Sequence, residues 1–247
     1  MLIEIYQQGL ILIVLISLFF NHLGSNILES ISIYYLCGMN ISNNKTDEQK
    51  IDALTPSSVI VVDTQFLDQF CGLIREDFSR NNNRELPLVD FAEVLCVLVM
   101  IIKKMGKMHS EHFQVILPYE AGNEAFNHLT PSHFIQDLDG KAFVDSMGEF
   151  AFAAVSSEKM AEYGDFFLDI LQVTIEHPEV KEIMVIGNEL EITEDLQKML
   201  LKPEAKEKSF YFPLINKETP VVPGITMPPV LVPALMQGLH LDPSDFQ

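Results

Sequence analysis

The stretch Val59-Ile60-Val61-Val62-Asp63-Thr64-Gln65-Phe66-Leu67-Asp68 decides the fold that we expect for this chain. Its four leading residues, all apolar and β-branched, are typical of a short strand buried on both faces, as in the interior of a parallel sheet. From Phe66 to Phe78 the apolar residues recur at helical intervals instead. The stretch therefore predicts a strand that ends on Asp63, followed by a helix over 65–80. Asp63 would then lie at the carboxyl edge of the sheet, where open α/β folds bind ligands.

Strand and helix patterns alternate along the rest of the chain. A helix containing 94–102 is expected after the capping pattern Asp90-Phe-Ala-Glu93. Further strands are expected at 113–117 (ended by Pro118), 150–155, 183–186 and 210–212, and further helices around 166–174 and over 193–201. An Asp-Gly pair predicts a hairpin over 134–144. This alternation predicts an α/β domain whose central sheet is mainly parallel and flanked by helices.

Four segments differ in composition: an apolar segment 1–38, a polar leader 39–56, the α/β domain 57–213 and a proline-rich tail 214–247. The tail carries apolar residues between its prolines, so we expect it to pack on the domain with a short helix near 230–238. Segment 1–38 has two interpretations. Residues 5–23 would form a single-pass membrane anchor, or Met39 is the true start and the protein is cytoplasmic.

The chain is acidic, with a formal charge of −19 and only 16 Lys and Arg. Such a charge disfavours binding to nucleic acid, whose backbone is anionic. We expect instead an unknown protein partner or a homo-oligomer, with membrane contact only if 1–38 is genuine. The three cysteines, Cys37, Cys71 and Cys96, form no metal-binding pattern and lie in apolar surroundings, as in a reduced intracellular protein.

Several acidic residues are expected to meet at the carboxyl edge. Asp63 ends the first strand, Glu189 follows the strand at 183–186, and Asp165 and Asp169 begin the helix between them. Carboxylate oxygens are the ligands that Mg²⁺ and Mn²⁺ prefer, so these four residues are the candidate metal-binding and catalytic set. The alternative is that each acid caps a helix or lies on the solvated surface. His109-Ser-Glu-His112 is a weaker candidate metal pair, because no second pair lies nearby.

The order of these units resembles that of NYN domains in the PIN-like nuclease superfamily. The matching units are the strand ending on Asp63, the helix Gly-Asp165-Phe-Phe-Leu-Asp169 and the strand followed by Gly187-Asn188-Glu189. The resemblance implies a parallel sheet and an acidic metal site that hydrolyses RNA. Where NYN domains usually have Ser-Gly-Asp-x-Asp, this chain has Ile-Gly-Asn-Glu-Leu-Glu, so an amide replaces one carboxylate. The chain is also similar to an uncharacterised bacterial family with Asp-Thr-Gln-Phe-Leu-Asp after a valine-rich strand.

Two functions follow as hypotheses. The first is a non-catalytic PIN/NYN-like interaction module, favoured by Asn188 and by the acidic charge. The alternative is a divergent metal-dependent ribonuclease that uses Asp63, Asp165, Asp169 and Glu189 with Mg²⁺ or Mn²⁺. Whether the protein is an enzyme stays open at this point.

Overall fold

The computed structural model describes residues 57–82, 85–157, 162–187 and 193–211. The expectations for the apolar segment 1–38, the anchor 5–23, the start at Met39, the leader 39–56 and the tail with its helix near 230–238 lie outside the described residues. Within the described ranges, no helix has both the length and the apolar character that crossing a bilayer requires.

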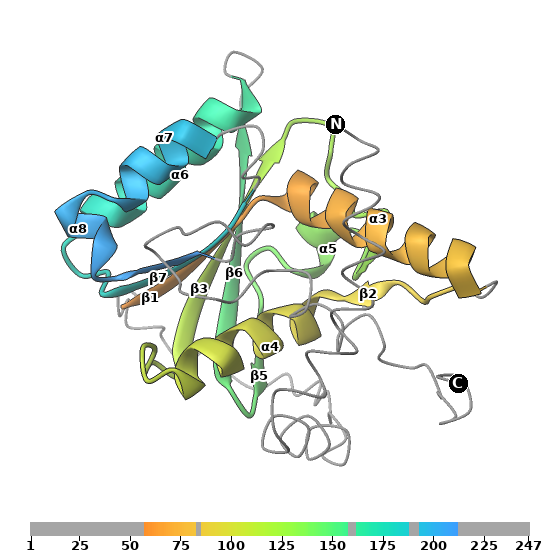
Figure 1. Cartoon of the computed structure of the whole chain (residues 1–247), viewed down its shortest axis with the longest axis horizontal. Coiled ribbons are helices and arrows are strands. Elements are labelled where there is room, and N and C mark those ends of the chain that lie inside the picture. The colour runs from red at the N-terminus through yellow and green to blue at the C-terminus, as the bar shows by residue number, and fades with distance from the viewer. Residues whose placement is uncertain (1–56, 83–84, 158–161, 188–192, 212–247) are drawn as a thin grey trace. The chain divides into compact units, whose positions relative to one another are not determined.

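A mainly parallel sheet of six strands forms the centre of the domain (Figure 1). The strands follow the order β5-β6-β3-β1-β7-β8, and only β5 runs antiparallel to its neighbour. Their bounds are β1 (Ser58–Val62), β3 (His112–Glu120), β5 (Ala142–Asp145), β6 (Gly148–Ser157), β7 (Glu182–Ile186) and β8 (Ser209–Tyr211). Two short strands, β2 (Val89–Asp90) and β4 (Leu129–Thr130), pair separately. The predicted fold class, α/β with a mainly parallel sheet flanked by helices, is confirmed.

Helices cover the two faces of the sheet in two groups (Figure 1). On one face lie α3 (Thr64–Asn82), α4 (Phe91–Lys104) and α5 (Phe134–Asp137), and on the other α6 (Tyr163–Glu176), α7 (Thr193–Leu200) and α8 (Pro203–Lys206). The chain first moves from β1 outward to β3 and β6, then returns past β1 to β7 and β8. Because parallel crossovers are right-handed, this reversal places the two groups of helices on opposite faces.

Strand β1 contributes side chains to both hydrophobic cores of the domain. All five of its residues are buried, and it pairs in parallel with β3 and with β7. Ile60 and Val62 belong to the larger core under α3 and α4, while Val59 and Val61 belong to the smaller core under α6 and α7. The predicted doubly buried strand is thus confirmed, and its alternate side chains serve different cores.

Helix α4 is the buried helix of the larger core, as its apolar sequence predicted. Asp90 caps it, because the Asp90 Oδ1 accepts from the backbone N–H of Ala92 at 2.9 Å and of Glu93 at 3.3 Å. All residues from Val94 to Val99 are buried, which covers every direction around the helix axis.

Strand β3 is longer than its sequence predicted. The prediction that Pro118 ends this strand is wrong, since β3 continues to Glu120 and Pro118 pairs with Val155 of β6. The pairing of β3 with β1 stops at Ile116, so Pro118 stands where β3 has a strand on one side only. A proline is tolerated at such an edge position because its missing N–H leaves no ladder bond unmade.

The hairpin predicted over 134–144 is also wrong. Residues Phe134–Asp137 form α5, and the hairpin consists instead of β5 and β6, which turn between Asp145 and Gly148. Gly140 does adopt the positive φ (68°) that an Asp-Gly pair indicates. This glycine, however, lies between α5 and β5, so it joins a helix to a strand, and its N–H donates to the Phe152 carbonyl of β6.

Candidate functional site

The carboxyl edge of the sheet is organised around Asp63, directly after β1. Its backbone N–H donates to the Ile186 carbonyl of β7 at 2.7 Å, which fixes Asp63 at the point where the two halves of the sheet meet. Only 5% of the residue is exposed. In open α/β sheets, the reversal of strand order opens a crevice at this edge, so Asp63 occupies the position where a ligand is expected.

The carboxylate of Asp63 caps helix α3. Its Oδ1 accepts from the backbone N–H of Phe66 at 2.9 Å, and its backbone carbonyl accepts the first helical bond from Leu67 at 3.0 Å. An aspartate at this position satisfies one of the donors that a helix start leaves unpaired. Asp63 therefore caps a helix, which the sequence analysis gave as the alternative to metal binding.

Tyr163, at the start of α6, closes over this carboxylate. Its hydroxyl lies 3.0 Å from the Asp63 Oδ1 and 3.0 Å from the Pro118 carbonyl oxygen. The Thr64 hydroxyl donates to the same carbonyl at 2.7 Å. Burial, reinforced by the negative charge of Asp63, raises the pKa of Tyr163, so its hydroxyl stays protonated and acts as a donor. This one side chain joins β1, β3 and α6.

The exposed rim of the edge consists of amide and carboxylate groups. Glu120 Oε2 accepts from Gln65 Nε2 at 3.2 Å and from Asn123 Nδ2 at 2.9 Å. These bonds tie the end of β3 to the start of α3 on the solvent side of Asp63.

Two of the predicted acidic residues lie on the exposed side of α6. Asp165 and Asp169 are exposed and lie about half a turn away from Phe167 and Leu171, two of the α6 residues that are buried in the smaller core. Glu189 lies outside the described residues. In the part of the chain that the structure describes, no group of three or more His, Cys, Asp or Glu could hold a metal ion. The acidic metal site, including Glu189, stays a prediction.

A second polar network lies beside this edge and was missed in the sequence. The carboxylate of Asp68, 7% exposed, accepts from the backbone N–H of Asn127 at 3.0 Å and of His128 at 2.7 Å. Arg75 Nη1 lies 3.1 Å from His128 Nδ1, and Arg75 Nη2 donates to the Leu86 carbonyl at 2.8 Å. Asp68 and Arg75 are seven residues apart, so polar spacing along one face of α3 was the signal that could have revealed this network.

The ring of His128 packs directly on Gly72. A Cβ atom at position 72 would lie 2.6 Å from His128 Cδ2 and Nε2, closer than carbon atoms approach each other in proteins. Together with Asp68, Gly72 holds the loop after β3 against α3. Apart from Arg75 Nε, which is buried without a hydrogen-bond partner, the polar groups named here bond to one another or to the backbone, so the network is a structural anchor.

The buried cysteines are poorly placed to react. Cys71 and Cys96 are buried and form no disulfide, as their apolar surroundings predicted, while Cys37 lies outside the described residues. Burial, with the nearby charge of Asp68, raises the pKa of the Cys71 thiol to about 12, and burial with Asp145 raises that of Cys96 further. A thiol that stays protonated at neutral pH is a poor nucleophile and a poor metal ligand.

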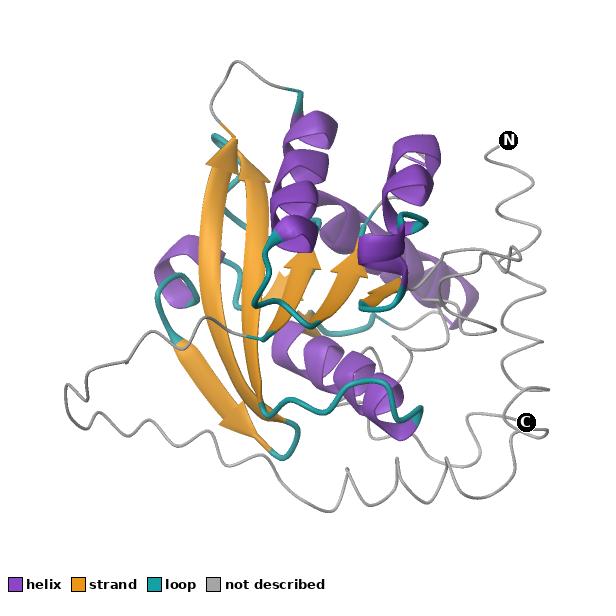
Figure 2. Ribbon diagram, turned by 90° about the vertical axis from the view of Figure 1, so that its left-hand side faces the viewer, coloured by secondary structure: helices purple, strands orange, loops and turns teal. Residues whose placement is uncertain are grey.

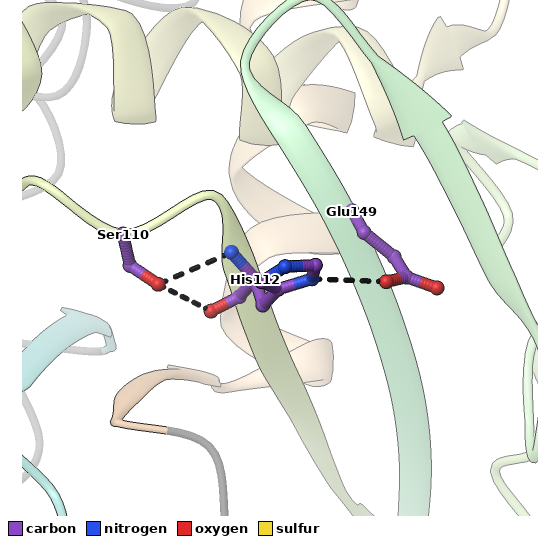
Figure 3. A network of polar contacts seen from close by, with 3 residues as sticks. All are labelled: Ser110, His112 and Glu149. Carbon is purple, nitrogen blue, oxygen red and sulfur yellow. Dashed lines mark hydrogen bonds and ion pairs between the residues drawn. The ribbon is translucent and has the colours of Figure 1, made fainter. Parts of the chain in front are cut away.

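The histidine pair suggested as a weak metal site lies at the opposite, amino edge. His112 Nδ1 lies 3.0 Å from Glu149 Oε2, and Ser110 bonds to the backbone of His112 through its hydroxyl (Figure 3). The backbone N–H of His109 donates to Glu182 Oε1 at 2.9 Å. The ring of His112 and the backbone of His109 therefore bond to different carboxylates, Glu149 on β6 and Glu182 on β7.

A family model matches most of the chain. A model described as a family of unknown function (DUF6621) matches residues 53–246. The chain belongs to this family. The DUF6621 match contains Asp63, Tyr163 and the Asp68 network, and it extends through the tail to residue 246. No curated protein and no solved structure matches the chain.

Proposed function

We propose that the domain is a non-catalytic, PIN/NYN-like interaction module that retains an α/β scaffold without metal-dependent chemistry. The observation that carries this proposal is the use of the Asp63 carboxylate. Its Oδ1 serves both as the cap of α3 and as the partner of the Tyr163 hydroxyl. A first-strand acid that serves as a metal ligand presents its oxygens to the ion, whereas here one oxygen is committed to protein donors.

The charge of the protein supports the same proposal. The formal charge of −19 repels the phosphates of RNA. Asp165 and Asp169 point to solvent, where carboxylates need no counter-ion. Asn188, outside the described residues, supplies an amide where NYN domains usually have a carboxylate.

The alternative is a divergent metal-dependent ribonuclease, favoured by the place of Asp63 in the fold. Asp63 lies at the end of the central strand, where the halves of the sheet meet, and Tyr163 brings the start of α6 next to it. In this alternative, Asp165, Asp169 and Glu189 would complete a site for Mg²⁺ or Mn²⁺.

Thermal unfolding of the wild type and of Asp63→Asn, each with and without Mn²⁺, separates the two functions. For an interaction module, we expect Asp63→Asn to change stability by less than about 0.5 kcal/mol, because asparagine caps helices as well as aspartate. Mn²⁺ should then leave both melting temperatures unchanged. Asp137→Asn, an exposed change on α5, is the matched control for the lost charge.

A metal site gives the opposite pattern. Mn²⁺ would raise the melting temperature of the wild type and of the control, but not that of Asp63→Asn. That result would contradict the non-catalytic proposal. Cleavage of labelled single-stranded RNA by the metal-loaded protein would then show whether the site is active.

A further inference from the structure

The two edge strands of the sheet differ in their exposure to solvent. At one edge, every residue of β8 is buried. At the other edge, β5 is open to solvent, with Ala142 exposed and Val144 exposed to 73%. An open edge strand presents unpaired backbone groups to other chains, and proteins usually cover or interrupt such edges.

The pairing of β5 with β6 shows which backbone groups face outward. The Phe152 N–H donates to the Lys141 carbonyl, and Asp145 closes the hairpin opposite Gly148. In an antiparallel pair, alternate residues direct their N–H and C=O groups to the partner strand. The Lys141 carbonyl and the backbone groups of Phe143 and Asp145 therefore bond toward β6, while the backbone groups of Ala142 and Val144 point away from the sheet.

We propose that β5 pairs with β5 of a second copy of this chain, antiparallel and centred on Phe143. In this register Ala142 faces Val144 of the second copy, so the outward N–H and C=O groups of both residues exchange hydrogen bonds in both copies. Lys141 then faces Asp145 of the second copy at each end of the pairing, which joins opposite charges directly across the strands. The outward direction of the backbone groups and the pairing of opposite charges therefore favour the same register.

The side chains of β5 suit this pairing on both faces. Phe143 is half-buried and stacks on Phe150 at a centroid distance of 4.7 Å, and its uncovered part would meet Phe143 of the second copy. On the other face, Ala142 and Val144 lie beside Ala151 and Glu149 of β6. In Figure 2 the short edge strand lies at the rim of the sheet, outside the two long strands.

The β5–β5 pairing would bury only a small area. A pairing of one short edge strand buries much less than the roughly 800 Å² per partner of a standard stable interface. We therefore expect a dimer that dissociates on dilution. Two strands, β6 and β3, lie between β5 and β1, so this inference does not depend on whether the carboxyl edge at Asp63 holds a metal ion.

Sedimentation velocity of the full chain at rising concentration tests the proposal. We expect the mass to approach twice the 28.0 kDa of one chain at about 100 µM, as for a weak interface. Val144→Pro removes an outward N–H while leaving the ladder to β6 intact, so it should keep the protein monomeric. Unchanged far-UV circular dichroism of this variant shows that the hairpin still folds.

A charge reversal tests the register without altering the backbone. Lys141→Glu would place a carboxylate opposite Asp145 twice per dimer and should raise the dissociation constant about tenfold. Lys104→Glu makes the same change at an exposed position of α4 and should leave the constant unchanged.

Crosslinking supplies a readout specific to this register. Phe143→Cys should form a covalent dimer on oxidation, because the two copies of position 143 face each other as a non-hydrogen-bonded pair. Val144→Cys, whose two copies lie diagonally apart, should crosslink much less. A monomer at every concentration would overturn the proposal, as would self-association that neither Val144→Pro nor Lys141→Glu weakens.

Discussion

Glu93 is an acid that the fold holds in an unfavourable place. It lies in the first turn of α4 and is 7% exposed, and its Oε2 is buried without a hydrogen-bond partner. Burial, followed by the nearby charges of Asp90 and Asp145, raises its pKa from 4.5 to about 7. The capping pattern predicted that Glu93 would help to cap α4, but only Asp90 does so.

This raised pKa predicts how stability depends on pH. Between pH 4.5 and about 7 the folded protein holds a proton on Glu93 that the unfolded chain has released. The free energy of unfolding therefore falls as pH rises through this window. We expect Glu93→Gln to stabilise the protein by about 1–2 kcal/mol at pH 8 and to have little effect at pH 4.

Urea unfolding at both pH values measures this difference. Glu179→Gln, at an exposed glutamate, is the matched control and should show no such dependence. Equal effects of Glu93→Gln at pH 4 and pH 8 would contradict a raised pKa at this position.

At the scale of elements, the loop after β3 is held to α3 by one carboxylate. Asp68 accepts from two consecutive backbone N–H groups, at Asn127 and His128, and the His128 carbonyl in turn accepts from the Val89 N–H of β2. This carboxylate therefore orders the small β2–β4 pair as well as the loop.

We expect Asp68→Ala to cost about 2–4 kcal/mol, because it leaves buried donors unpaired. Hydrogen exchange should rise first in peptides covering 123–130. Glu76→Ala, at an exposed position of the same helix, is the control. A loss of stability without faster exchange in this loop would contradict the anchoring role.

The elements show what the sequence could and could not predict. Strand β1 and helix α3 were predicted because their patterns are local: four buried β-branched residues, then apolar residues at helical spacing. The turn at Gly140 was predicted correctly, but the elements that it joins were not. An Asp-Gly pair indicates a positive φ and does not indicate which elements lie on either side.

The candidate site was predictable in position but not in its contacts. Asp63 could be placed at the carboxyl edge from the end of a strand pattern. Its partner Tyr163 is 100 residues away, and nothing in a local pattern indicates a bond over that distance. The local sequence also does not show which side of α6 packs on the sheet, so the exposure of Asp165 and Asp169 could not be predicted from it.

At the scale of the whole molecule, β1 joins the two cores, so we expect the domain to unfold as one unit. Ile60→Ala removes a fully buried side chain from the larger core and should cost about 2–5 kcal/mol. Hydrogen exchange in strongly protected peptides of both α4 and α6 should then rise together, although Ile60 faces only the α4 side. Val173→Ala, at a side chain exposed to 66%, is the control. Faster exchange in α4 alone would show that the cores open independently.

The central place of β1 also governs how the chain reaches its fold. Ser58 at the start of β1 bonds to Glu182, which lies 124 residues later in the sequence. Contacts between such distant residues make folding slow, because a long loop must close before they form. At a synthesis rate of about 5–20 residues per second, β1 is synthesised roughly 6–25 s before β7. During that interval its valine-rich sequence has no β7 to pair with, and newly made chains are then most exposed to aggregation.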